Sequence, residues 1–355
     1  MSEYNPVTRI KVFGVGGGGC NAVNRMVGLN AMGADFYVVN TDKQNLQASK
    51  CENKILIGYN TTHGLGAGGN PEVGKAAALE SESELRDAVQ NADMIFVTTG
   101  LGGGTGTGAA PVLARIARES GALTIGIVTK PFSFEGKRRM MQAINGLDEL
   151  KQYVDSLIIV PNERVSEYLG KIPFNQAFLQ ADNVLVQAVK TITDLVSYNA
   201  IINLDFADIK STLANQGTAL IGVGQVSPSD VNDKDDMPRE AALRAVSCPL
   251  LESSISGARK CIINVSGGES LTIDSANAAV KAVEEEAGGD IDVIFGLSYN
   301  ENLQDTIVVT VIATGYDNVK PEDTFDKRTL DGNESIGGVD YQNAKIPSFF
   351  EHRND

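Results

Sequence analysis

Two glycine-rich segments, residues 14–21 and 102–108, are the features that most constrain what this sequence can fold into. Each follows a short apolar run and precedes a stretch with the pattern of a helix. A strand, a turn without side chains and a helix start together direct several backbone N–H groups and a positive dipole end towards one anion. One such segment is also compatible with a tight turn. Two of them predict a polyphosphate that is held from two sides.

The overall composition argues against several other classes of protein. A chain of 355 residues can bury a sizeable core and form about two domains. The formal charge of −15 argues against a nucleic-acid partner bound by phosphate neutralisation, and we interpret it as a contribution to solubility. The four cysteines and two histidines show no metal-ligand spacing, which argues against a zinc site. Without an apolar stretch of membrane-spanning length or a signal-peptide pattern, we expect a cytosolic protein with no direct membrane insertion.

The order of apolar runs predicts an α/β protein. Between residues 9 and 165, strand-like runs alternate with helical stretches, which predicts a mainly parallel sheet with helices on both faces. In such sheets ligands bind at the carboxyl ends of the strands, where both glycine-rich segments fall. Residues 174–198 repeat apolar side chains at steps of three and four, as in a largely buried long helix. The strand-like runs are residues 9–14, 35–40, 94–99, 122–129 and 156–160.

The remainder of the sequence predicts a second, smaller α/β domain followed by a disordered tail. Strand-like runs at 218–225, 260–265, 291–296 and 306–314 surround helices near 239–249 and 273–286. Residues 317–344 are polar and charged, with little apolar surface to bury. We therefore expect a nucleotide-binding domain over residues 1–173, a central helix over 174–198, an acidic loop and connecting helix over 199–216, a second domain over 217–316, a disordered linker over 317–344 and a terminal peptide over 345–355.

The glycine-rich segments suit phosphate binding without the usual lysine. No Gly-Lys-Ser/Thr stands at the spacing of a Walker-type P-loop, so backbone amides would have to replace that lysine. In the second segment, the hydroxyls of Thr105 and Thr107 add donors to the backbone amides. A third glycine-rich segment, residues 64–71, could close over a terminal phosphate; the alternative is a flexible surface loop.

Side chains on the long helix suggest recognition of a guanine base. Phe178 and Asp182 lie four residues apart and share a helix face. An aromatic ring can stack on a purine, and a carboxylate can accept the paired N1–H and N2–H donors of guanine, which adenine lacks. The alternative is a core phenylalanine and a solvated or capping aspartate.

Three residues before the long helix are further candidates for the site. Glu135 and Arg139 either hold ribose and phosphate or form an ion pair, and Asn162 is a candidate for a base or ribose contact.

A dinucleotide-binding dehydrogenase is the runner-up function. Gly14, Gly16 and Gly19 form a G-x-G-x-x-G pattern, and Asp42 after the second strand-like run could hold a ribose. However, no histidine lies in a plausible catalytic position, and the second glycine-rich segment would have no role.

Two carboxylates beyond the long helix raise a geometric question. Asp205 and Asp208 could orient water or help to hold a cation; the alternative is that one of them caps a helix. With a rise of 1.5 Å per residue, the helix separates Asp182 from Asp205 by roughly 25–30 Å. Either the acidic pair has no part in catalysis, or it acts on a nucleotide held by a neighbouring molecule. Such a head-to-tail contact propagates as a filament unless it closes into a ring.

Over residues 9–316 the sequence resembles the FtsZ family of the tubulin superfamily, most specifically in Gly-Gly-Gly-Thr-Gly-Thr-Gly at residues 102–108. Residues 64–74, 134–139, 161–162 and 203–208 also match that family in order and spacing. The resemblance implies a GTPase domain, a central helix and a C-terminal polymerisation domain, with GTP or GDP between head-to-tail copies of the chain and Mg²⁺ beside it. It places nucleotide contacts at Gly17, Gly18, Gly19, Cys20, Asn21, Gly102, Gly103, Gly104, Thr105, Gly106, Thr107, Gly108, Glu135, Arg139, Asn162, Phe178 and Asp182, and hydrolysis at Asn203, Asp205 and Asp208 of the adjoining subunit.

The resemblance also implies a function and partners. It indicates a cytoplasmic protein of the mid-cell division ring, with tubulin-like roles in plasmid segregation or cell shape, or a monomeric GTP switch, as alternatives. Ile346, Pro347, Phe349 and Phe350 resemble the family's C-terminal peptide for adaptor or membrane-tether proteins, although the flanking residues are degenerate. Cys20 replaces the glycine or other small residue usual in the family. We expect nucleotide binding to persist there, and the thiol could add redox sensitivity.

Overall fold

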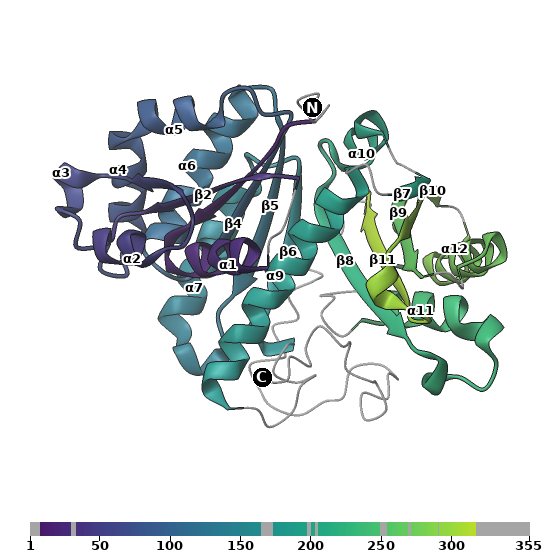
Figure 1. Cartoon of the computed structure of the whole chain (residues 1–355). Helices are drawn as coiled ribbons and strands as arrows, with labels where there is room; N and C mark the ends of the chain where they lie inside the picture. Colours follow the sequence, from purple (N-terminus) through teal and green to yellow (C-terminus); the bar gives the residue numbers. More distant parts are fainter. Residues whose placement is uncertain are drawn as a thin grey trace. The chain divides into compact units, whose positions relative to one another are not determined.

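The computed structural model describes residues 8–29, 33–164, 173–196, 200–202, 205–248, 254–268, 271–289 and 291–316. The chain divides into two compact units, Met1–Ala219 with Gly296–Ser298 and Leu220–Phe295 with Tyr299–Asp355 (Figure 1). The helices that precede residue 217, including the long one, therefore belong to the first unit. The predicted α/β class is confirmed. The predicted linker and terminal peptide lie outside the described residues.

The first unit is built on a parallel sheet with the strand order β3-β2-β1-β4-β5-β6. All the expected strand-like runs of this unit are strands. The short β3 was not expected, because its first two residues are exposed and it lies at the sheet edge. The strands are β1 (Ile10–Val15), β2 (Asp35–Asn40), β3 (Asn53–Leu56), β4 (Met94–Gly100), β5 (Leu123–Lys130) and β6 (Ser156–Pro161), with β7 (Ala200–Ile202) further along the chain.

Helices cover both faces of this sheet because its strands are apolar on both sides. Alternate residues of β1 separate the two faces, since Phe13 packs with α4, α5, α6 and α7 in one apolar cluster while Val12 is buried against the other face. The long helix α9 packs against α1. The helices are α1 (Gly16–Gly28), α2 (Lys43–Ala48), α3 (Tyr59–Thr62), α4 (Pro71–Glu80), α5 (Glu82–Val89), α6 (Thr105–Glu119), α7 (Lys137–Leu150), α9 (Phe174–Val196) and α10 (Phe206–Leu213), with a short 3-10 helix, η1 (Ser133–Glu135).

The second unit combines antiparallel strands with two helices. Strand β8 (Gly217–Val226) begins in the first unit, where Gly217 to Ala219 pair with β6, and its later residues pair antiparallel with β11 (Ile307–Thr314). Strand β9 (Lys260–Gly267) pairs antiparallel with the other side of β11. Strand β10 (Asp292–Tyr299) follows β9 in the strand order β8-β11-β9-β10. The helices are α11 (Met237–Val246) and α12 (Ile273–Ala287), with short 3-10 turns η2 (Pro228–Asp230), η3 (Lys234–Asp236) and η4 (Glu301–Leu303).

Glycines in β8 allow α11 to approach the sheet closely. A Cβ on Gly222 would lie 2.0 Å from the carbonyl oxygen of Ala245, and one on Gly224 would lie 2.0 Å from that of Ala241. Any side chain at these positions would force the helix away from the strand. Among the described residues, no helix is both long and apolar enough to cross a membrane.

Candidate nucleotide-binding site

The first two glycine-rich segments meet at one edge of the first unit's sheet. Strand β1 ends at Val15 and α1 begins at the next residue, while α6 begins at Thr105, shortly after β4. Because β1 and β4 are parallel neighbours, their carboxyl ends lie side by side. Gly16 has a φ of +69°, and a Cβ there would lie 2.7 Å from the backbone nitrogen of Gly106. The two helix N-termini thus converge, as an anion site requires.

The third glycine-rich segment packs against the second. A Cβ on Gly104 would lie 2.8 Å from the Cβ of Ala67 and 2.9 Å from the backbone nitrogen of Asn70. Asn70 caps α4, because its side chain accepts a hydrogen bond from the N–H of Glu72. At the other end of α4, Gly58 donates its N–H to the hydroxyl of Ser81. The segment therefore has a defined place beside the second segment in this structure, as a loop that covers a phosphate would need.

Two glycines border open space instead of packed atoms. A Cβ added to Gly17 or to Gly103 would meet no atom within 4 Å beyond its own chain neighbours and its own helix backbone, whereas a Cβ on Gly106 would lie 2.2 Å from the Thr99 hydroxyl. Gly17 and Gly103 come from different segments, and the segments touch through Gly16 and Gly106. The missing side chains leave a cradle lined by backbone at the start of α1 and α6, which fits a nucleoside polyphosphate.

The threonines of the second segment also hold the loop together. The hydroxyl oxygens of Thr105 and Thr41 lie 2.6 Å apart, which joins the start of α6 to the residue after β2. The Thr107 hydroxyl accepts a hydrogen bond from the N–H of Gly102 at 2.9 Å, and Thr107 is buried. Thr107 therefore closes its own loop. Its role as a phosphate contact stays a prediction.

Cys20 is part of the core beneath the first segment. It is 1% exposed, and its thiol donates weak hydrogen bonds to the carbonyl oxygens of Gly14 and Val39. Burial raises the pKa of the thiol to about 12. Because the thiolate is the reactive form, this environment argues against the redox sensitivity that the sequence suggested. Gly19 is also packed inward, and Asn21 is exposed.

Three aromatic rings form a cluster at the start of α9. The ring centroid of Phe178 lies 5.1 Å from that of Phe132 and 6.3 Å from that of Phe134, and both contacts are edge-on. Phe132 is buried, while Phe134 is 57% exposed. The cluster therefore leaves the Phe134 ring largely exposed to solvent near the end of α9 that carries Asp182, as a purine-stacking site requires.

Asp182 is paired with a residue of α1. Its Oδ2 lies 3.5 Å from Nε of Arg25, and the two side chains are 18% and 29% exposed. Burial raises the pKa of the Asp182 carboxyl to about 6, with Arg25 acting in the opposite direction. The carboxylate is mostly buried and lies within α9 instead of capping it, and its role in base recognition stays a prediction.

Glu135 and Arg139 form the ion pair that was one of their two expected roles. Arg139 Nη1 lies 3.1 Å from Glu135 Oε2, and Glu135 Oε1 accepts a hydrogen bond from the N–H of Phe132. Arg139 remains about half exposed and could still contact a ligand. Next to this turn, Glu163 accepts hydrogen bonds from both the N–H and the hydroxyl of Ser133. This clasp ties the turn to the end of β6.

Asn162 carries an unpaired polar atom at the site. It is 5% exposed, and its Oδ1 has no hydrogen-bond partner among the described residues. A buried acceptor without a donor is costly. It follows β6, in parallel register with the strand that precedes Phe132. A donor from a bound base or ribose would satisfy this atom, which fits the role expected for Asn162.

The acidic pair lies elsewhere. Asp205 is the N-cap of α10, since its Oδ1 accepts a hydrogen bond from the N–H of Asp208 at 3.0 Å. Asn203 lies outside the described residues. Beyond the far end of α10, the N–H of Asn215 donates to Asp155, which also accepts from the N–H of Thr124. Asp155 directly precedes β6, so this end of α10 is fixed at the amino ends of the parallel strands.

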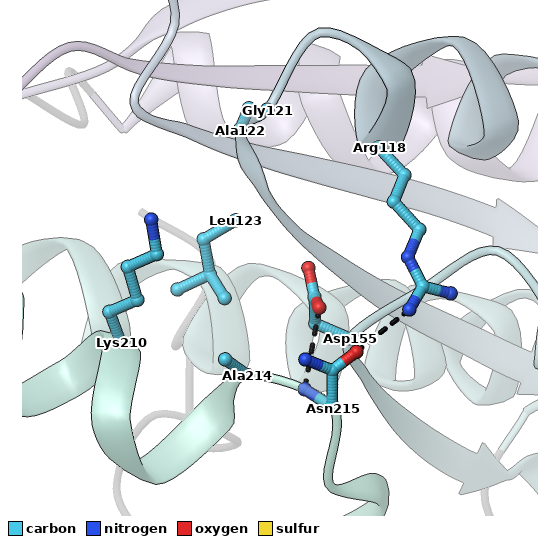
Figure 2. A pocket seen from close by; sticks show the side chains of 8 residues that line it. All are labelled: Arg118, Gly121, Ala122, Leu123, Asp155, Lys210, Ala214 and Asn215. Atoms are coloured by element: carbon cyan, nitrogen blue, oxygen red, sulfur yellow. Dashed lines mark hydrogen bonds between the residues drawn. The ribbon is translucent and has the colours of Figure 1, made fainter.

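A pocket of about 240 Å³ lies at this second edge of the sheet. Figure 2 shows Arg118 and Asp155 directed at Asn215 on one side and Lys210 of α10 on the other. Arg118 donates to Asn215 Oδ1 at 2.7 Å and to the carbonyl oxygen of Gln152 at 2.9 Å. The pocket is distinct from the glycine cradle, because the cradle lies at the carboxyl ends of the strands.

Within the described part of the chain, no group of three or more His, Cys, Asp or Glu side chains is arranged to hold a metal ion. A Mg²⁺ ion would have to take most of its ligands from phosphates and water. We therefore assign no step to a metal.

The fold and the cradle define a nucleotide-binding protein of the parallel α/β class, and comparisons with known proteins specify its family. The model of the Tubulin/FtsZ family, GTPase domain, matches residues 9–170, and that of the FtsZ family, C-terminal domain, matches residues 217–317. The chain belongs to the tubulin/FtsZ family and is a GTPase that binds guanine nucleotides. The dehydrogenase alternative is thereby set aside.

Solved structures agree with this assignment. An FtsZ mutant from M. jannaschii is 43% identical with a TM-score of 0.82, and the match covers 88% of this chain and 92% of that one. An empty FtsZ dimer from M. jannaschii is 40% identical with a TM-score of 0.83, covering 95% and 96%. A GTPγS-bound protofilament of CetZ2 from Haloferax volcanii, 23% identical with a TM-score of 0.76 and covering 91% and 98%, shares the fold.

Several residues of the site were not expected from the sequence. Thr41, Arg25 and Glu163 contact expected site residues or the turn that carries them, and they lie far apart in the chain. Asp182 was a weak signal for Arg25, because a carboxylate on a largely apolar helix needs a cationic partner. No sequence signal identified the other two, because their partners are distant in the chain.

Proposed function

We propose that this GTPase assembles head to tail into single-stranded filaments and organises cell division as a cytoplasmic ring at mid-cell. GTP lies between subunits, with its phosphates on the backbone amides of one copy. Asp205 and Asp208 of the next copy, with Asn203, position water for attack on the γ-phosphate, while the amides offset the charge that spreads over the transferring group. Hydrolysis then weakens the contact between subunits.

One observation carries this proposal. The glycine cradle lies at the carboxyl ends of the parallel strands, whereas α10, with Asp205 and Asp208, is fixed through Asn215 and Asp155 at their amino ends. Strand β5 between these edges is 8 residues long, or roughly 25 Å at about 3.3 Å per residue. The fixed end of α10 thus lies a strand's length from the phosphates bound by its own molecule, and α10, with 8 residues at about 1.5 Å each, is too short to span that distance. This supports a second copy as the source of the acidic pair.

Two of the solved relatives support self-association: one is described as an FtsZ dimer and another, which shares the fold alone, as a protofilament. The apolar residues Ile346, Pro347, Phe349 and Phe350, which suit an adaptor or membrane tether, favour the division role over plasmid segregation or cell shape. They lie outside the described residues.

The rate of GTP hydrolysis per molecule, measured from nanomolar to micromolar protein, tests the shared site. We expect the rate to rise with concentration, together with sedimentation in GTP but not in GDP. A rate that is independent of concentration would indicate a monomeric GTP switch instead.

A second test mixes the variants Asp208→Ala and Thr105→Arg. GTP hydrolysis in the mixture should exceed that of either variant alone, because each variant supplies the half of the site that the other lacks. Asp208→Ala alone should still bind GTP.

Base recognition by Asp182 has its own test. Guanine offers an amine at C2, whereas xanthine offers a carbonyl oxygen there. Asp182→Asn replaces an acceptor oxygen by an amide donor, so it should weaken GTP binding and favour XTP. Retained preference for GTP in this variant would remove Asp182 from base recognition without affecting the shared-site argument.

A further inference from the structure

We propose that Arg25 is a positioning residue that holds the Asp182 carboxylate ready for the two N–H donors of guanine and so determines the base selectivity of this site. The inference rests on the proposed role of Asp182 in base recognition. It adds to the site a residue from the last turn of α1, outside the glycine-rich segments and outside the turns that follow the strands.

The contacts form a fork between two helices. Arg25 lies in the last turn of α1, and its Nε is 3.5 Å from Asp182 Oδ2 on α9. The Nη1 of the same guanidinium donates to Oδ1 of Asn183 at 3.2 Å. Asn183 in turn donates to Oε1 of Gln180 at 3.1 Å. One planar guanidinium therefore fixes two consecutive residues of α9, which a single ammonium group would do less rigidly.

Helix α1 connects the two ends of the site. Its first residue, Gly16, packs against the second glycine-rich segment, and Arg25 lies nine residues further on. At a rise of 1.5 Å per residue this is roughly 14 Å, similar to the span from the phosphates to the base of an extended nucleotide. The helix that offers its N–H groups to phosphate thus also places the cation that faces the base-recognising carboxylate.

The surroundings of Asp182 make this cation important. Among the described residues, Arg25 is the charged group that acts on Asp182, and its neighbours Asn183 and Gln180 are neutral. Burial raises the pKa of the carboxyl to about 6, and the charge of Arg25 lowers it. A carboxylate can accept both guanine donors, whereas a protonated carboxyl has lost one acceptor. Without Arg25, the pKa of the carboxyl would rise, so that it would stay protonated up to a higher pH, and it would lose the contact that orients it.

The test compares Arg25→Met, which removes the charge, with Arg25→Lys, which retains it. Affinities for GTP and ITP, which lacks the C2 amine, are measured between about pH 5.5 and pH 8.5 by displacement of a fluorescent GDP. Wild-type affinity for GTP should fall as the pH falls through about 6. In Arg25→Met this fall should move to a higher pH by at least about one unit, which is a factor of about ten in the ratio of ionised to protonated carboxyl at a given pH. The preference for GTP over ITP should fall with it.

The pH dependence of GTP affinity in the variants distinguishes a positioning role of Arg25 from a packing role. Arg25→Met should regain only part of its GTP affinity at high pH, because the charge effect is then relieved but the carboxylate stays unpositioned. Arg25→Lys, which keeps the charge but not the two-pronged contact, should keep the wild-type pH profile with a smaller loss of affinity, and Asp182→Asn should show no such pH dependence. Equal weakening of GTP and ITP at every pH would overturn the inference, because it would show a packing role alone. If Arg25→Met does not fold, an unshifted profile in Arg25→Gln would overturn it equally. Wild-type protein that binds ATP as well as GTP would instead refute base recognition by Asp182 itself.

Discussion

The carboxylate of Asp155 accepts a hydrogen bond from the backbone N–H of Asn215, with a distance of 3.3 Å between Oδ1 and the nitrogen. Its other oxygen accepts from the N–H of Thr124 at 2.9 Å, and its own backbone carbonyl accepts from Gln216 and Gly217. Asp155 is buried. One residue thus joins β5, β6 and the turn after α10, and it fixes the helix that carries Asp208 to the sheet.

Asp155→Ala should therefore lower stability and slow hydrolysis without weakening nucleotide binding. Two N–H groups would lose their acceptors, at a cost of about 1–3 kcal/mol each. GTP affinity should be unchanged, because the glycine cradle lies at the opposite ends of the strands. Urea denaturation and nucleotide titration measure the two effects. Asp148→Ala, which removes an exposed carboxylate on α7, serves as the matched control and should change neither.

Alanine substitutions at the two open glycines should separate binding from folding. Gly17→Ala and Gly103→Ala add a methyl group where no atom lies within 4 Å, so the fold should keep or gain up to about 1 kcal/mol of stability. The same methyl would occupy the cradle and should lower GTP affinity about tenfold, or about 1.4 kcal/mol. Isothermal titration and thermal unfolding measure both quantities.

Two further glycines are controls for that experiment. Gly28→Ala, at the far end of α1, also adds a methyl to open space and should leave GTP affinity unchanged. Gly106→Ala would place its Cβ 2.2 Å from the Thr99 hydroxyl and should destabilise the fold by about 1–3 kcal/mol. Wild-type GTP affinity in both Gly17→Ala and Gly103→Ala would show that phosphate binds elsewhere.

The two roles of Asp205, helix cap and hydrolytic carboxylate, can be separated by charge. Asp205→Asn keeps a good N-cap for α10, so the free energy of unfolding should stay within about 0.5 kcal/mol of wild type, whereas Asp205→Ala should lose about 0.5–2 kcal/mol. If the charge acts in the neighbour's site, phosphate release in the polymer should fall strongly in both variants. Full activity in Asp205→Asn would leave only the capping role. Asp274→Asn, in the first turn of α12, controls for loss of one surface charge.

The sequence predicted those features of the fold and site that depend on local pattern. The run 94–99 was recognisable because β4 is buried on both faces, and the glycine-rich segments were recognisable because close backbone approach needs glycine. The four-residue β3 was not, since half of it is exposed.

The cross-links within the site could not be predicted in the same way. The hydroxyls of Thr41 and Thr105 meet across 64 residues, and Arg25 reaches Asn183 across 158. These contacts depend on how α1, α6 and α9 pack on the sheet. Neither composition nor spacing specifies that packing. The cap on α10 was expected as an alternative, because capping is a local interaction.

The titration of Asp182 makes a prediction for stability. Burial raises its pKa in the folded protein from 3.8 to about 6, so between these values the folded state binds more protons than the unfolded state. This contribution to stability is complete below the unfolded pKa and is lost as the pH rises through about 6. Asp182→Asn cannot ionise. The unfolding free energy of the variant minus that of wild type should therefore increase between about pH 5 and pH 7.5, by on the order of 1 kcal/mol, and level off above that range.

Far-UV circular dichroism in urea at several pH values measures this difference, and other titrating groups cancel between the two proteins. The loss of a partner for Arg25 shifts the whole curve without changing its slope, because the guanidinium stays charged throughout. Arg25→Lys, which leaves Asp182 in place with a cation beside it, should give a curve parallel to wild type. If the difference in unfolding free energy between Asp182→Asn and wild type does not change with pH, the prediction is wrong. The Asp182 carboxyl would then have its ordinary pKa and be more exposed to solvent than its contacts with Arg25 indicate.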